Sequence, residues 1–75
     1  MTIPLKKWKK FLTVEGLICK RIESSHEIWD KPDDSLPRPI VVDSKHKEVP
    51  MLHISTGLRT LGISRKDFLK KIQNL

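Results

Sequence analysis

His26 is a candidate for proton transfer because of the residues around it. It follows Ser24 and Ser25, which form a polar break, and it begins a strand-like run. Histidine titrates near physiological pH, so its ring can take or give a proton at a ribose 2′-hydroxyl or at a leaving oxygen. The preceding basic pair, Lys20 and Arg21, could hold the phosphate that joins those oxygens.

Two further histidines offer contacts of the same kind. His46 lies between Lys45 and Lys47, and these loop charges fit either a solvated surface or a phosphate clamp beside a strand. His53 lies near a predicted helix start, where it fits an ordinary residue, a second acid or base, or a phosphate ligand. The histidines and Cys19 lack the short paired spacing of structural zinc motifs, so no metal or other cofactor is expected.

A helix and three strands must position these groups. Residues 4–15 carry apolar side chains at helical spacing opposite four lysines, with Thr2 as the expected N-cap and Gly16 as the stop. Residues 17–31 predict a hairpin, residues 32–39 a loop with three prolines, and residues 39–43 a third strand. Residues 44–50 predict a polar loop.

Two helices follow this loop. The first starts near residue 51 and closes at Gly62, and the second is capped by Ser64, with Asp67 completing a variant capping box. We expect their apolar faces to be formed by Leu52, Ile54, Leu58 and Leu61, and by Phe68, Leu69, Ile72 and Leu75. The whole chain is therefore predicted to be one α+β domain, residues 1–75, with a short extra C-terminal helix.

Alternation along the second strand divides its side chains between two faces. One face takes His26, Ile28 and Asp30, and the other takes Glu27, Trp29 and Lys31. Trp29 fits either stacking on a base from an open sheet face or filling a small core. Trp8 and Phe11, by their spacing, are expected in the core.

Charge favours a polyanionic partner. The chain has 15 Lys and Arg against 9 Asp and Glu, which gives a formal net charge of +6. The excess lies at the two helix-rich ends, whereas residues 23–44 are acidic. A single cysteine excludes an internal disulfide and fits a reducing cytoplasm, and no signal peptide or membrane segment is expected.

The sequence resembles the HicA-type, or YcfA-like, toxins of bacterial toxin–antitoxin systems. The family signature is a basic strand, a Gly-Ser-His bend, an apolar and aromatic strand, and a proline. The matching positions are Arg21, Ser24-Ser25-His26, Ile28-Trp29 and Pro32, followed by PIVVDSKHKEVP and LRTLGISRKDFLKKI. The chain departs from the family at Ser24, where the family has glycine, and at Leu52-His53-Ile54, where it has Gly-Thr-Leu.

The resemblance implies a fold and an activity. The fold would be like a double-stranded-RNA-binding domain, α-β-β-β-α, with helices on one face of a three-stranded antiparallel sheet. The activity would be that of an mRNA interferase, a cytoplasmic RNA endonuclease that needs no metal and is neutralised by a HicB-type antitoxin. His26 would be catalytic, and the expected phosphate ligands are Lys20, Arg21, Ser25, Lys45, His46, Lys47 and His53.

Two other functions fit the same residues. A non-catalytic RNA-binding module on this fold would use the basic groups without proton transfer. A helix-turn-helix in residues 53–74, with its turn at Gly62, would bind DNA, although the three strands argue against it.

Overall fold

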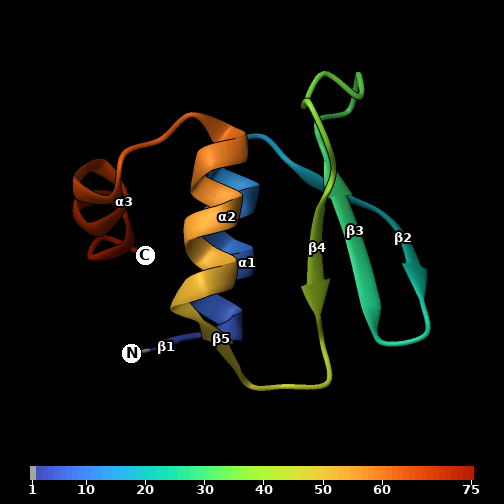
Figure 1. Ribbon diagram of the computed structural model, residues 1–75, viewed down its shortest axis with the longest axis horizontal. Helices are drawn as coiled ribbons and strands as arrows, with labels where there is room; N and C mark the ends of the chain where they lie inside the picture. The colour runs from blue at the N-terminus through green and yellow to red at the C-terminus, as the bar shows by residue number, and fades with distance from the viewer. Residues whose placement is uncertain (1) are drawn as a thin grey trace.

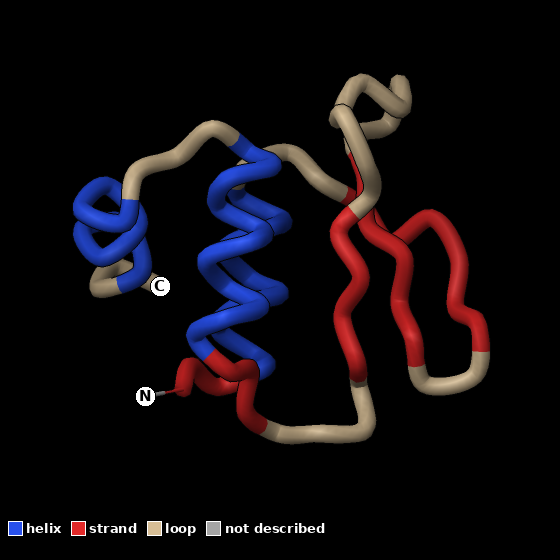
Figure 2. Tube along the Cα trace, viewed as in Figure 1, coloured by secondary structure: helices blue, strands red, loops and turns tan. Residues whose placement is uncertain are grey.

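Helices cover one face of a three-stranded antiparallel sheet in the computed structural model, which describes residues 2–75 (Figures 1 and 2). The sheet has the order β2-β3-β4, and α3 lies on the far side of α1 and α2 from it. The predicted α+β class is confirmed, and the order of elements is compatible with the predicted α-β-β-β-α layout apart from two further short strands. The elements are β1 (Thr2–Pro4), α1 (Leu5–Val14), β2 (Ile18–Glu23), β3 (His26–Asp30), β4 (Ile40–Asp43), β5 (Glu48–Pro50), α2 (Met51–Leu61) and α3 (Arg65–Ile72).

The start of α1 differs from the prediction. Thr2 does not cap the helix, because it lies in β1 and its hydroxyl donates to Glu48 Oε1 at 2.8 Å. Pro4 precedes the helix, and the Leu5 amide donates to the Lys47 carbonyl at 2.7 Å. The loop residue directly before β5 thus satisfies the first amide of the helix, where a side-chain cap was expected. The predicted stop at Gly16 is confirmed, since Gly16 takes φ +90° directly after the helix.

A two-stranded antiparallel ribbon, β1 with β5, was not predicted. Thr2 pairs with Pro50 and Ile3 with Val49, so residues 48–50 are strand and not the expected loop. Because Pro50 directly precedes α2, this ribbon fixes where α2 starts relative to α1. It also draws residues 44–47 toward the end of β4.

The core lies between the sheet and the helices. Trp8 stacks on Phe11 with ring centroids 5.7 Å apart, and Phe68 of α3 meets Phe11 edge-on at 4.9 Å. From the sheet, Trp29 enters this core with 7% of its surface exposed, so of the two alternatives for Trp29 the structure shows the core position. The predicted core positions of Trp8 and Phe11 are confirmed.

Two leucines were placed wrongly on apolar faces. Leu52 is 75% exposed, whereas Ile54 and Leu58 are buried. Residues two apart on a helix point about 200° apart, so Leu52 and Ile54 cannot share one face. Leu69 is also exposed, because α3 buries only the side that carries Phe68 and Ile72.

Gly57 lets α2 pack closely on α1 and the sheet. A Cβ atom at this position would lie 2.8 Å from Trp8 Cζ2 and 3.9 Å from Ile40 Cδ1. Trp8 cannot retreat easily, because its ring is buried against Phe11 and Phe68. A glycine that looks unfavourable for a helix is therefore explained by the close approach of α2.

We predict that Gly57→Ala lowers the free energy of unfolding. The overlap with Trp8 should cost about 1–3 kcal/mol, more than the roughly 1 kcal/mol that alanine gains in helix propensity. Urea denaturation measures the change, and Ser55→Ala, an exposed site on the same helix, is the matched control. An alanine variant at residue 57 as stable as the Ser55→Ala protein would contradict the close packing.

Candidate nucleic-acid cleft

A cleft runs between the free edge of β4 and helix α2. One part of it, with a volume of about 370 Å³, is lined by His26, Arg38, Asp43 and His53, together with Thr56 and Thr60 of α2. The other part, of about 500 Å³, also contains Asp43 and His53 and adds His46 and Lys47. The two parts share Ile40, Val41, Asp43 and His53, so they form one continuous depression, called the β4–α2 cleft below.

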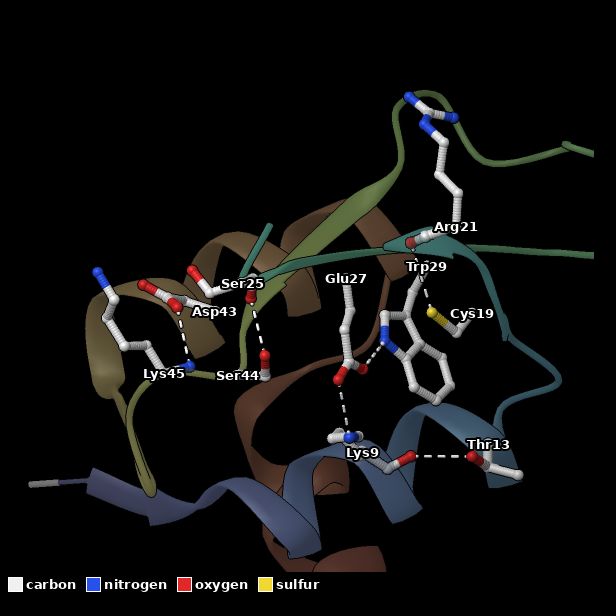
Figure 3. Close-up of polar contacts among 10 residues, drawn as sticks. All are labelled: Lys9, Thr13, Cys19, Arg21, Ser25, Glu27, Trp29, Asp43, Ser44 and Lys45. Carbon is white, nitrogen blue, oxygen red and sulfur yellow. Dashed lines mark hydrogen bonds and ion pairs between the residues drawn. The ribbon is translucent and has the colours of Figure 1, made fainter. Parts of the chain in front are cut away.

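The hairpin bend positions His26 at this cleft. Ser24 takes φ +60°, the left-handed conformation that glycine adopts most easily. The bend is tied to the end of β4, because both the amide and the hydroxyl of Ser44 donate to the Ser25 carbonyl, at 2.8 and 2.9 Å (Figure 3). The register then places His26 opposite Asp43.

Asp43 supplies a negative charge in the cleft. The backbone amide of Lys45 donates to its Oδ1 at 3.0 Å (Figure 3). This hydrogen bond lowers the pKa of Asp43 most, helped by the Ser25 hydroxyl and by His46 and His26, against a smaller opposing effect of desolvation. Asp43 is therefore ionised at neutral pH, and its contribution to stability is lost only as the pH falls through this lowered pKa.

Several predicted phosphate ligands meet in or beside the cleft. His46 and Lys47 line its larger part, and His46 Nε2 lies 3.8 Å from Asp43 Oδ2. Ser25 and Lys45 lie at its end through their contacts with Ser44 and Asp43. The cleft thus joins a strand start, a loop and a helix that are far apart in the sequence.

Lys20 and Arg21 are not brought to the cleft. Lys20 Nζ bonds the Pro32 carbonyl at 2.9 Å and Asp34 at 3.1 Å, at the other end of the hairpin from His26. Arg21 forms an ion pair with Glu23 on the edge strand β2. Neither side chain is among the residues that line the cleft, although the register sets Glu23, the partner of Arg21, opposite His26. Their role as phosphate ligands beside His26 stays a prediction.

Arg38 is the cleft residue that sequence reasoning missed. It lies in the proline-rich loop before β4 and lines the same part of the cleft as His26. Its only signal in the sequence is that it is the single basic residue between Lys31 and Lys45. No sequence pattern around Arg38 indicates that the loop places this side chain in the same part of the cleft as His26.

A second polar cluster lies on the helix-covered side of the sheet, away from the cleft. Glu27 is buried, and its carboxylate accepts from Lys9 Nζ at 3.0 Å and from Trp29 Nε1 at 3.0 Å (Figure 3). All partners are satisfied, so this cluster joins α1 to β3 and offers no free group to a ligand. It also confirms that Glu27 and Trp29 share a face.

Comparisons with known proteins give no relative. No family model, no curated protein and no solved structure matches the chain. Among residues 2–75, no helix has the length and apolar character needed to cross a membrane, and no three His, Cys, Asp or Glu side chains group as a metal site.

We predict that Ser24→Gly stabilises the protein. A non-glycine residue in the left-handed conformation costs about 1–2 kcal/mol, and glycine avoids much of that cost. Urea denaturation should show a rise in the free energy of unfolding on the order of 1 kcal/mol, offset in part by the greater freedom of glycine in the unfolded chain. Ser35→Gly, an exposed loop substitution, is the control. A loss of stability in the glycine variant at residue 24 would contradict the left-handed bend.

Proposed function

We propose that this protein is an RNA endonuclease, an mRNA interferase toxin of the HicA type, in which His26 transfers a proton during cleavage. The β4–α2 cleft carries the proposal, because it sets an exposed histidine among Arg38, His46 and Lys47. The order α-β-β-β-α, with helices on one face of the sheet, is compatible with a domain like those that bind double-stranded RNA.

The cleft has the groups that phosphoryl transfer requires. Arg38 and Lys47 are the cations that would bind phosphate oxygens and stabilise the charge that develops on them. His26 would give or take a proton, since cleavage of the anionic phosphodiester linkage removes a proton from the attacking oxygen and adds one to the leaving oxygen. Asp43 would orient or charge-balance the ring opposite it.

The partner that silences such an enzyme would be an acidic HicB-type antitoxin. The surface offers exposed lysines on α1 and in the loop after β4, which an acidic protein would recognise. An antitoxin over the β4–α2 cleft would cover His26 and the phosphate ligands together.

Cleavage of RNA by the purified protein tests the proposal. We expect His26→Gln to slow cleavage by about 10²–10⁴-fold, the usual contribution of general acid–base catalysis, and to relieve growth arrest on expression. Cleavage should continue in a chelator. Lys66→Gln on α3, outside the cleft, is the matched control. If the His26→Gln protein cleaves as fast as the wild type, the assignment of His26 is wrong; if the wild type binds RNA but never cleaves it, the protein is a binding module.

Salt dependence of binding tests the phosphate ligands separately. In a His26→Gln background, which prevents cleavage, Arg38→Gln should reduce the slope of log affinity against log salt by about 0.7 on single-stranded RNA. A complex with one phosphate contact fewer releases fewer counterions when it forms. Lys66→Gln should leave the slope unchanged. Equal slopes for Arg38→Gln and Lys66→Gln would remove Arg38 from the site, and tighter binding to duplex DNA than to RNA would favour the helix-turn-helix alternative.

A further inference from the structure

His53 is the one histidine of residues 2–75 that lines both parts of the β4–α2 cleft. It faces the smaller part together with His26. The two histidines come from opposite walls, since His26 begins β3 and His53 lies in the first turn of α2. Within residues 2–75, neither ring makes a hydrogen bond or forms an ion pair within 4.0 Å, so their nitrogens are free for a ligand.

The fold holds His53 in place. Pro50 begins α2 at the end of the β1–β5 ribbon, and Gly57, one turn beyond His53, packs against Trp8. A side chain on a helix fixed at both points keeps a defined distance from the sheet. Thr56 and Thr60 give their hydroxyl protons to carbonyls one turn back, so these protons are already used within α2.

We infer that His53 is a second catalytic residue, which transfers the other proton of the cleavage step opposite His26. This inference rests on the proposed function. Cleavage by the RNA 2′-hydroxyl needs a base at one oxygen and an acid at another, on opposite sides of phosphorus. Two free histidines on facing walls of one cleft meet that need.

The surroundings of each ring assign the roles. We assign the base to His53, which reaches both parts of the cleft from the first turn of α2. We assign the acid to His26, because Asp43 lies opposite it on β4 and its carboxylate would accept from one ring nitrogen while the other nitrogen gives its proton. The other charged neighbours are Arg38 in the cleft and Glu23 across from His26 on β2, and Glu23 is already paired with Arg21.

The step balances without a co-reactant. His53 takes the proton of the 2′-hydroxyl, the 2′-oxygen forms a bond to phosphorus, the bond from phosphorus to the 5′-oxygen breaks, and His26 gives its proton to that oxygen. The products are an RNA end with a 2′,3′-cyclic phosphate and an RNA end with a 5′-hydroxyl. A DNA linkage lacks the 2′-hydroxyl and should not be cleaved.

Leaving-group chemistry separates the two histidines. The substrate is an RNA oligonucleotide with either an ordinary linkage or a linkage in which sulfur replaces the 5′-oxygen, because a thiolate leaves without an acid. We expect His53→Gln to slow cleavage of both substrates by about 10²–10⁴-fold. His26→Gln should be slow on the oxygen substrate and recover most of its rate on the sulfur substrate. Ser55→Ala, exposed on α2 beyond the cleft lining, should cleave both substrates as the wild type does.

The outcomes distinguish this inference from the proposed function. If the wild type does not cleave RNA, both fail. If His26→Gln is inactive but His53→Gln is fully active, only the role of His53 is wrong. Rescue of His53→Gln by sulfur would contradict the assigned roles. The RNA ends that the wild-type protein produces give a further test. Ends without a 2′,3′-cyclic phosphate would also overturn the inference.

Discussion

The close approach of α2 to Trp8 and the sheet is the constraint on which the β4–α2 cleft depends. Gly57 has no side chain, so α2 can lie where a Cβ atom would come within 2.8 Å of the Trp8 ring. Trp8 is itself held by Phe11 and Phe68, which join α1 and α3 in one aromatic core. Core packing thus sets the width of the cleft, and it also fixes the spacing of the polar groups that line the cleft.

Ion pairs divide the charges of the chain into two groups. Glu27 is neutralised by Lys9 inside the protein, and Glu15 by Lys71, with 2.9 Å between the charged atoms. Lys20 with Asp34 and Arg21 with Glu23 add pairs at the surface. Much of the acidic charge is consequently paired with lysine or arginine far from the cleft, and Arg38 and Lys47 remain to attract a polyanion at the cleft itself.

Local patterns predicted most of the fold. The amphipathic repeat of α1, the hairpin, and the Ser64 cap, whose hydroxyl accepts from the Asp67 amide at 3.1 Å, all depend on residues a few positions apart. The β1–β5 ribbon was missed because three-residue strands carry no alternation signal and because Thr2 pairs with Pro50, which lies 48 positions further along the chain. The site was predicted in part: His26 and His53 were candidates from the sequence, whereas the position of Arg38 in the cleft and of Lys20 outside it depends on which segments the fold brings together.

The central claim is that one cleft places His26 and His53 on either side of an RNA phosphate. The most direct measurement is an NMR titration with an RNA oligonucleotide whose 2′-oxygens are methylated, so that it binds without being cleaved. The account predicts that the ring resonances of both histidines shift together, at the same RNA concentration, while those of α3 do not. Shifts confined to α3, or to the exposed edge of β2 around Arg21, would contradict it.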